Sequence, residues 1–401
     1  MYLYKRLLPY IMICALFSIL LFASCAKKDK PTDPSNSIPS APTNLLAEII
    51  SDTEIKLTWQ DNSNNEKGII IERRINMTES WSEIQDLNAN YTYHNDTGLI
   101  SIGLYYYRVM AYNDYGSSNY SNVICVKNYS VPQLILIPNG EFQMGDNYNE
   151  GYSDDTPVHN VYLDDYYIGQ YEISNNQYCS FLNGMKSVVE VKPTYIFYLY
   201  YNKPVNLIEF SSSKIFWNGN HFYIEANYDN HPVIGLNFKA VIVYCNWLSE
   251  REGLDKAYDS DFKLDVLKNG YRLPTEAEWE KAARGGLVNK RYPWGDSIDS
   301  SKANYGLNNS GTTEVGIYPA NNYGLYDMAG NASEWCNDWY DSSYYNVSPY
   351  NNPIGPSSGV YKVMRGGTWY NIIDLLKCSA RLDYDLTSSS SGSGFRIVRN
   401  K

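Results

Sequence analysis

The segment from Asp327 to Glu334 contains the best candidates for metal ligands in this sequence. It reads Asp-Met-Ala-Gly-Asn-Ala-Ser-Glu, so two carboxylates and the carbonyls of a glycine-kinked backbone fall within eight residues. Hard cations such as Ca²⁺ prefer oxygen ligands of this kind. The segment therefore predicts a calcium site, with a cap or turn carrying two solvated acids as the alternative.

Cysteines and histidines are too scattered to predict a soft-metal cluster. The histidines are His94, His159, His221 and His231. The cysteines of the C-terminal two-thirds are Cys179, Cys245, Cys336 and Cys378. Four cysteines allow three pairings, and the sequence does not choose among them. Cys179 and Cys245 lie on apolar faces of expected helices, so a buried pair, a disulfide or two separate thiols are all open.

A groove is the second candidate feature, because stiff aromatic side chains make good contact surfaces. The candidate groove residues are Trp335, Trp369, Tyr370, Asn371 and Arg381. Core packing is the competing interpretation of the aromatic residues. Arg365, Arg381 and Arg396 could bind an anionic substrate, but arginines beside buried aromatics and acids more often form structural ion pairs.

Three helices are expected to position these residues. Ser174 and Gln177 fit a capping box at the start of the first, and Thr275 and Glu278 fit another at the start of the third. The second is predicted over residues 240–252, with Val241, Tyr244, Cys245 and Leu248 on one face. A hairpin is predicted over 215–223, and few regular elements are expected after Gly286, where loops rich in Gly, Asn and aromatics dominate.

Residues 41–128 predict a β-sandwich, because short β-branched and aromatic runs alternate with turn residues. The segment resembles a fibronectin type III domain, with Trp59 on the second strand and Tyr105 as the corner tyrosine. A spacer or adhesive module is the expected role. Cys125, on the last strand, is predicted to be a small buried residue.

The N-terminus resembles a bacterial lipoprotein signal. Lys5 and Arg6 precede an apolar run over residues 7–23, and small residues lead to Cys25. This pattern predicts a signal peptide over 1–24, a lipid on Cys25 and a tether over 25–40, with an uncleaved anchor as the alternative. The expected location is the extracytoplasmic face of the cell envelope, at the outer membrane.

The amino-acid composition limits the kinds of partner that this protein is expected to bind. The 401 residues include 33 Lys and Arg against 44 Asp and Glu, giving a formal charge of −11. This balance argues against a nucleic-acid partner. An excess of Tyr, 40 against 11 Phe, suggests wet extracytoplasmic surfaces.

A series of short motifs occurs in order across residues 132–400. The motifs are Phe142-Gln143-Met144-Gly145, Tyr171-Glu172-Ile173-Ser174-Asn175, Arg272-Leu273-Pro274-Thr275-Glu276, Asn322-Tyr323-Gly324-Leu325-Tyr326-Asp327, Gly330-Asn331, Glu334-Trp335, Arg365-Gly366-Gly367-Thr368-Trp369 and Gly394-Phe395-Arg396. Together they closely resemble the formylglycine-generating-enzyme, or sulfatase-modifying-factor, family. The resemblance implies a compact, irregular α+β domain distantly similar to C-type lectins.

The resemblance also implies what the site contains and lacks. The family's oxidases convert a sulfatase cysteine to formylglycine, using copper(I) held by two thiolates five residues apart after the Arg-Gly-Gly-Ser-Trp strand. Here Asn371 stands in the place of the first thiol and no second follows, so copper is not expected. Cys378 matches a structural cysteine whose usual partner position is Ala283.

Calcium ligands are likewise implied by the resemblance. Asp327, Gly330, Ala332 and Glu334 match the positions that hold calcium in family members. A second family site is in doubt, because Asn304 matches its first ligand while the loop that follows lacks the acid.

Two functions are therefore expected. The preferred one is a lipid-anchored, non-catalytic binding or scaffold protein whose partners are envelope proteins or glycans. The alternative is a formylglycine-generating oxidase with a rearranged site.

Overall fold

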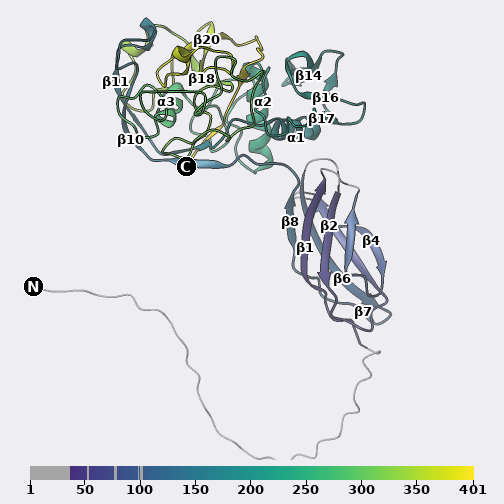
Figure 1. The fold of residues 1–401 in the computed structure, drawn as a ribbon. Helices are drawn as coiled ribbons and strands as arrows, with labels where there is room; N and C mark the ends of the chain where they lie inside the picture. Colours follow the sequence, from purple (N-terminus) through teal and green to yellow (C-terminus); the bar gives the residue numbers. More distant parts are fainter. Residues whose placement is uncertain (1–36, 52–53, 76–78, 98, 100–102) are drawn as a thin grey trace, which may run out of the picture.

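The computed structural model of the protein describes residues 37–401 except 52–53, 76–78, 98 and 100–102 (Figure 1). Cys25, the signal segment and nearly all of the tether lie outside the described residues and stay predictions. Among the helices of the described part, none is long and apolar enough to cross a bilayer.

Two antiparallel sheets make up the N-terminal part. The first has the order β1-β2-β5, and the second has the order β4-β3-β6-β7, with β8 also paired to β6. The bounds are β1 (Thr43–Ser51), β2 (Glu54–Gln60), β3 (Gly68–Ile75), β4 (Ser82–Asn88), β5 (Tyr93–Asp96), β6 (Leu104–Asn113), β7 (Gly116–Ser117) and β8 (Ile124–Lys127).

A single core joins the two sheets, and strict alternation along β6 supplies much of it. Tyr105, Tyr107, Val109 and Ala111 are fully buried, while the residues between them are half-buried. This is the period of two that a strand with one buried face requires. Assignment of this part to the fibronectin type III family stays a prediction.

The prediction that Cys125 is buried is wrong. On β8 it is Val126 that faces the core, and Cys125 is exposed. Successive side chains of a strand point to opposite faces, so only one of these two neighbours can be inside.

The three predicted helices of the C-terminal part are confirmed. They are α1 (Asn175–Met185), α2 (Phe238–Arg251) and α3 (Glu276–Arg284). Both capping boxes form, since Ser174 and Thr275 each accept a hydrogen bond from the third helical amide. Helix α2 begins before its predicted start, because the Asn237 side chain accepts from the amide of Ala240.

Sheet dominates the rest of the C-terminal part. Its sheets have the orders β10-β11, β22-β12-β9, β13-β14-β15, β16-β17 and β20-β19-β18-β21. The bounds are β9 (Leu134–Ile137), β10 (Gly140–Met144), β11 (His159–Leu163), β12 (Tyr166–Gly169), β13 (Glu190–Val191), β14 (Tyr195–Tyr200), β15 (Lys203–Glu209), β16 (Ile215–Trp217), β17 (Phe222–Ile224), β18 (Ser333–Trp339), β19 (Tyr361–Arg365), β20 (Leu382–Asp385), β21 (Ser393–Gly394) and β22 (Val398–Asn400). The predicted hairpin over 215–223 is confirmed as β16 and β17.

The expectation of few regular elements after Gly286 holds only to residue 332. From β18 onward the chain forms a four-stranded sheet that sequence periodicity did not predict. Five of the seven residues of β18 are buried and the other two are half-buried, so the strand has no exposed alternate face. Fully buried strands lack alternation and cannot be recognised by it.

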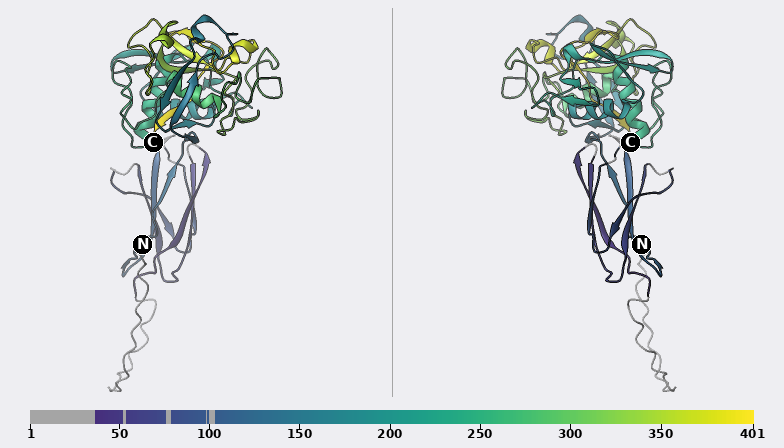
Figure 2. Two further views of the ribbon diagram at one scale, coloured as in Figure 1. Left: turned by 90° about the vertical axis from the view of Figure 1, so that its left-hand side faces the viewer. Right: turned by 90° about the vertical axis from the view of Figure 1, so that its right-hand side faces the viewer.

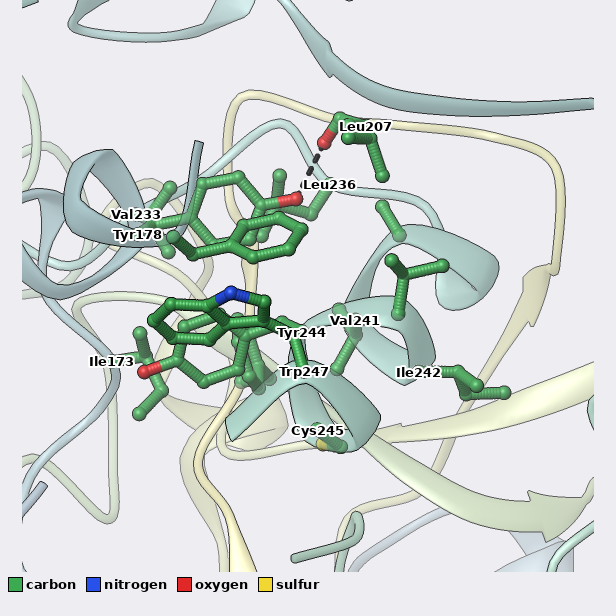
Figure 3. Close-up of a cluster of buried hydrophobic side chains, with 14 of the residues drawn as sticks. Ile173, Tyr178, Leu207, Val233, Leu236, Val241, Ile242, Tyr244, Cys245 and Trp247 are labelled. Atoms are coloured by element: carbon green, nitrogen blue, oxygen red, sulfur yellow. Dashed lines mark hydrogen bonds between the residues drawn. The ribbon is translucent and has the colours of Figure 1, made fainter. Parts of the chain in front are cut away.

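Helices α1 and α2 build the larger core with stacked aromatic rings (Figure 3). The Tyr178 ring lies 5.7 Å from that of Tyr244, and its hydroxyl donates to the carbonyl of Leu207 at 2.6 Å. Cys179 and Cys245 both lie in this core as free thiols. They occupy apolar space, as buried free cysteines commonly do.

The N-terminal sheets and the larger domain follow one another as an elongated molecule (Figure 2). At the junction, Lys127 forms an ion pair with Glu252 at 2.7 Å. The Tyr129 hydroxyl donates to the same carboxylate at 2.6 Å. These contacts connect the end of β8 to the end of α2.

Candidate functional site

Four loops of the C-terminal domain meet at Asn331. Its backbone amide donates to the carbonyl of Asn304 at 2.8 Å, and its carbonyl accepts from the amide of Trp369 at 3.0 Å. Its side-chain oxygen accepts from the amide of Thr313 at 2.9 Å, and its nitrogen donates to Glu172 at 2.9 Å. The residue is fully buried with φ of 62°, a left-handed conformation that Asn tolerates well. Asn331 therefore fixes the relative positions of the segments that form the site.

The predicted calcium loop, Asp327–Glu334, is buried rather than solvated. Both Glu334 oxygens accept hydrogen bonds from Arg396, at 2.6 and 2.7 Å, and one also accepts from the indole of Trp279. Asp327 has φ of 55° and accepts from the amide of Gly316 at 2.7 Å. The alternative of a turn with solvated acids is thus wrong.

Negative charge exceeds positive charge around this loop. Glu172, Asp327 and Glu334 are all buried and act on one another, and Arg396 is the cation that acts on all three. Burial raises the pKa of Asp327 to about 6. Burial, together with Asp327 and Glu334, raises the pKa of Glu172 well above its usual range. An additional cation would relieve this imbalance.

The oxygen atoms of the loop fit a calcium ion in part. Among the described residues, no hydrogen bond reaches the carbonyl oxygens of Gly330 and Ala332, and one Asp327 oxygen is likewise not bonded. The Glu334 carboxylate, by contrast, is held by Arg396. Three of the four predicted ligands can therefore offer oxygens to a hard cation, whereas Glu334 would have to be shared. No group of three or more His, Cys, Asp or Glu side chains suited to a metal occurs in the part of the chain that the structure describes.

Close packing explains the glycine of this loop. Gly330 has φ of 81°, and a Cβ there would lie 2.2 Å from the carbonyl oxygen of Asn304. The Asn304 side chain is used within its own loop, since it donates to the carbonyl of Gly311 at 2.9 Å and accepts from Asn309 at 3.0 Å. Asn304 thus acts here as a loop-organising residue.

Asn371, in the place of the first copper thiol, closes a turn. Its side-chain oxygen accepts from the amide of Thr368 at 2.8 Å, and its own amide donates to the carbonyl of Thr368 at 3.1 Å. Its carbonyl accepts from the amide of Gly306 at 2.9 Å. The side chain therefore performs a structural task that a thiolate ligand could not perform while binding metal.

Cys378 lies beneath this loop as a buried free thiol. Burial raises its pKa to about 12, so it is a poor source of thiolate at neutral pH. Its backbone carbonyl accepts from Arg365 at 2.7 Å, and Ala283 packs in the same core. The residue has the surroundings of a structural cysteine.

An exposed apolar surface adjoins the Asn371 turn. We call it the apolar loop surface, and it consists of Leu307, Trp369, Tyr370, Ile372 and Ile373. Leu307 is 65% exposed and Ile372 is 61% exposed. The two loops are joined, since the amide of Leu307 donates to the carbonyl of Trp369 at 3.0 Å. Apolar side chains gathered on loops in this way are typical of a contact surface.

The prediction that Trp335 and Arg381 line a groove is wrong, because both are buried. Trp335 is fully inaccessible and donates from its indole to the carbonyl of Leu236 at 2.9 Å. Arg381 donates to both oxygens of Glu276, at 2.7 and 3.0 Å. Trp369, Tyr370 and Asn371 remain at the surface loop.

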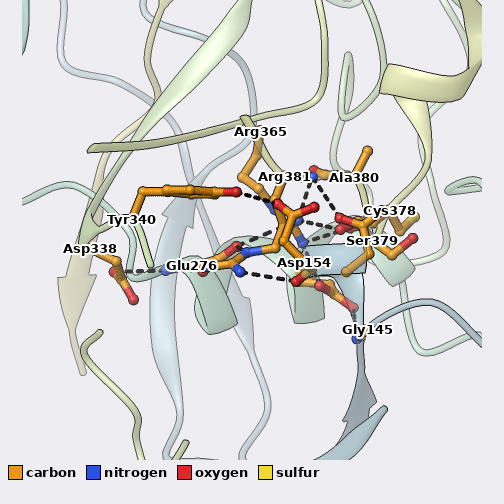
Figure 4. Close-up of polar contacts among 12 residues, drawn as sticks. Gly145, Asp154, Glu276, Asp338, Tyr340, Arg365, Cys378, Ser379, Ala380 and Arg381 are labelled. Atoms are coloured by element: carbon orange, nitrogen blue, oxygen red, sulfur yellow. Dashed lines mark hydrogen bonds and ion pairs between the residues drawn. The ribbon is translucent and has the colours of Figure 1, made fainter. Parts of the chain in front are cut away.

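Buried ion pairs account for the arginines at the motif ends (Figure 4). Arg365 pairs with Glu280 and donates to the carbonyls of residues 378, 379 and 380. Figure 4 shows Arg365 and Arg381 converging on the segment around Glu276. Both terminal nitrogens of Arg365 and all three guanidinium nitrogens of Arg381 donate to protein acceptors, so these two arginines bind α3 and its surroundings rather than face a substrate.

Sequence reasoning missed two contributors to the site. Glu172 and Asn331 both lie in the family-like motifs, but neither motif assigns them a role. The Gly330-Asn331 pair was a usable signal, because Gly and Asn favour left-handed backbone. Long-range partners such as Glu172 carry no local signal.

The sequence and the fold of this domain both match known proteins. Residues 122–401 match the family described as the sulfatase-modifying factor enzyme 1-like domain. The chain is 37% identical over 270 residues to the serine/threonine-protein kinase pkn1 of Chlamydia pneumoniae, covering 67% of this chain and 38% of that protein. It therefore spans little more than a third of that relative, whose kinase name is said of that protein alone.

Two further matches extend over most of the length of the matched protein. The chain is 31% identical over 299 residues to the formylglycine-generating enzyme of Streptomyces coelicolor, covering 66% of this chain and 88% of the enzyme. In structure it resembles Treponema denticola variable protein 1, with a TM-score of 0.53 and 27% identity over 70% of this chain and 96% of the other. With its C-terminal two-thirds matched in both sequence and fold, the chain belongs to the sulfatase-modifying factor enzyme 1-like family.

Proposed function

We propose that this protein is a non-catalytic binding or scaffold protein of the bacterial cell envelope. One observation carries the proposal: Asn371 occupies the place of the first copper thiol and its side chain is used to close the 368–371 turn. Copper(I) binding needs soft sulfur ligands, and none follows in the loop at the family spacing. The loop therefore lacks the thiol ligand, and the proposed loss of copper chemistry rests on this difference in sequence.

The apolar loop surface is the part of the molecule proposed to contact the partner. It adjoins the turn that would hold the active centre in an oxidase, so a client that once entered the site would meet Leu307, Tyr370 and Ile372 first. Envelope proteins or glycans are the proposed partners, with residues 41–128 as a fibronectin-like spacer and a lipid on Cys25 as the anchor.

An oxidation assay separates this proposal from formylglycine formation, which the likeness to the Streptomyces coelicolor enzyme favours. The protein is incubated with copper(I), oxygen and a Cys-x-Pro-x-Arg peptide, and aldehyde is sought by mass spectrometry. We expect no aldehyde, while the Streptomyces enzyme run in parallel converts the peptide. Turnover by this protein would overturn the binding proposal in favour of the oxidase.

Capture of envelope partners tests the surface. Full-length protein is crosslinked in envelope membranes, with Ile372→Ser as the test variant and Val347→Ser, an exposed apolar residue of another loop, as the matched control. We expect Ile372→Ser to lose partners that the wild type and Val347→Ser both retain. Equal capture by all three proteins would remove the apolar loop surface from the proposal.

Calcium binding is proposed for the Asp327–Glu334 loop, with Asp327, Gly330, Ala332 and Glu334 as the ligands. A bound Ca²⁺ would supply positive charge among the buried acids and hold the site loops in place. Chelator-treated protein titrated with CaCl₂ should release or absorb heat and melt at a higher temperature. Asp327→Asn should weaken binding about tenfold or more, and Asp299→Asn, an exposed acid, should not. Absence of both the heat signal and the thermal shift would overturn the proposed calcium site.

A lipid anchor is tested at Cys25 directly. We expect wild-type protein to incorporate a labelled fatty acid and to fractionate with membranes, and Cys25→Ser to do neither. Membrane fractionation of Cys25→Ser equal to wild type would favour an uncleaved apolar anchor instead.

A further inference from the structure

A cavity of about 570 Å³ lies away from the proposed contact surface. It is bordered by the start of α2, the strands β18 and β19, and the segment 261–266, and α2, β18 and β20 are labelled in Figure 1. It shares no lining residue with the apolar loop surface or with the Asp327–Glu334 loop. Its volume lies within the range of small-molecule sites, roughly 300–1,000 Å³.

Three lysines line this cavity, which we call the lysine pocket: Lys239, Lys263 and Lys362. One acidic residue lines it, Asp261, which is exposed and paired with Lys203. Among the described residues, none of the three lysines forms a salt bridge. On a chain of formal charge −11, this is a local concentration of positive charge, in which Asp338 is a buried acid that acts on Lys362.

Lys362 is the central group, because it is charged, buried and incompletely bonded. It is 5% exposed, and its ammonium donates to the carbonyl of Asn337 at 2.6 Å. It also lies 3.9 Å from the ring centroid of Trp339 and 4.5 Å from that of Phe238. An ammonium has three donors, and the structure provides one hydrogen-bond acceptor among the described residues. Two donors thus remain for a ligand.

The start of α2 adds to the positive field. Lys239 lies in the first turn of this helix, which contains no acidic residue. A cation there opposes the helix dipole, whose amino end is itself positive. Both the lysine and the helix end would be stabilised by an anion in the pocket.

The remaining lining is mostly apolar, with Asn337 and Ser357 as its polar residues. Trp339 and Phe262 contribute rings, and Leu264, Ile354 and Pro356 contribute aliphatic surface. Aromatic walls suit the face of a six-membered ring, and the lysines suit an anionic group on its edge. From this geometry we infer that the lysine pocket binds a carboxylate carried on a six-membered ring, the chemistry shared by hexuronic acids and aromatic acids.

Titration calorimetry with defined probes tests this inference on the full chain. The probes are trigalacturonic acid, 4-hydroxybenzoate and the uncharged sugar maltotriose. We expect at least one of the two acids to bind and maltotriose not to bind, and the responding acid identifies the source of the carboxylate. Failure of both acids to bind, or equal binding of maltotriose, would overturn the inference.

Variants place the binding in the pocket. Lys362→Met and the double variant Lys239→Gln/Lys263→Gln should each weaken binding about tenfold or more. Lys186→Gln, a lysine outside the pocket, should leave it unchanged. The double variant alters partly exposed side chains, so it keeps the test valid if Lys362→Met does not fold. Unchanged affinity in the double variant would overturn the inference. The outcome is independent of the oxidation assay, because no residue is shared with the Asn371 loop.

Discussion

At the scale of single residues, the site is organised by side chains that bond the backbone rather than by side chains that do chemistry. Asn331 joins the loops of Asn304, Thr313 and Trp369, and Asn371 closes its own turn. Amides suit this task because each offers both donors and acceptors. An amide at position 371 is therefore compatible with an ordered loop.

Asn331→Ala tests this organisation. Alanine would leave buried partners unbonded and would occupy a left-handed conformation at a cost of roughly 1–2 kcal/mol. We expect the free energy of unfolding to fall by about 2–4 kcal/mol, measured by urea denaturation. Asn346→Ala, in an exposed turn, is the control and should change it by less than about 0.5 kcal/mol. Equal small losses in both variants would show that Asn331 does not hold the loops together.

At the scale of elements, helices were predictable from sequence and the last sheet was not. Capping residues such as Ser174 and Thr275 act over three positions, so a local pattern reveals them. Strand β18 is buried on both faces and pairs with β19 and, in parallel, with β21, partners far along the chain. No periodic pattern of apolar residues within the strand indicates such pairing.

The same distinction applies to the site. Its loop from Asp327 to Glu334 and the turn at Asn371 were recognisable from motif order. Burial of Trp335 and Arg381 was not, because it depends on distant partners, the carbonyl of Leu236 and the carboxylate of Glu276. Residues whose role is set by contacts within a few positions can be predicted, and those set by long-range contacts cannot.

Helix α3 gives a direct measure of what one cap contributes. The Thr275 hydroxyl accepts a hydrogen bond from the amide of Glu278, and the Glu278 carboxylate accepts one from the amide of Thr275 at 2.8 Å. We expect Thr275→Ala to lower the free energy of unfolding by about 0.5–2 kcal/mol, and Thr275→Ser to restore most of it because the hydroxyl is retained. Denaturation curves decide between these outcomes. A serine variant as weak as alanine would assign the effect to the lost methyl group instead.

At the scale of the whole molecule, the acidic chain buries several carboxyl groups in its larger domain. Burial raises the pKa of Asp338 to about 8, with Glu276 also raising it and Lys362 lowering it. Burial raises the pKa of Asp155 to about 7, with Arg365 acting in the opposite direction. Each of these groups binds its proton more tightly in the folded chain than in the unfolded chain, where the pKa is near 3.9.

Asp338 and Asp155 should each lower stability as the pH rises from 5 to 7. In this window each of these carboxyls binds its proton in the folded protein and has lost it in the unfolded chain, so each makes the free energy of unfolding decrease with pH, by up to about 1.4 kcal/mol per pH unit. His94 and His231, whose pKa values burial lowers, act in the opposite direction. Asp338→Asn removes one group while keeping an oxygen that can accept from the amide of Glu276, as Asp338 does at 2.9 Å. We expect urea unfolding at pH 5, 6 and 7 to show a shallower decline for Asp338→Asn than for wild type. Asp299→Asn, an exposed acid whose pKa is lowered by its hydrogen bonds from Ser301, should follow the wild-type slope, because Asp299 is ionised in both the folded and the unfolded chain across this window. Parallel slopes for wild type and Asp338→Asn would mean that Asp338 is ionised in the folded protein, and that the neighbouring Lys362 compensates its charge.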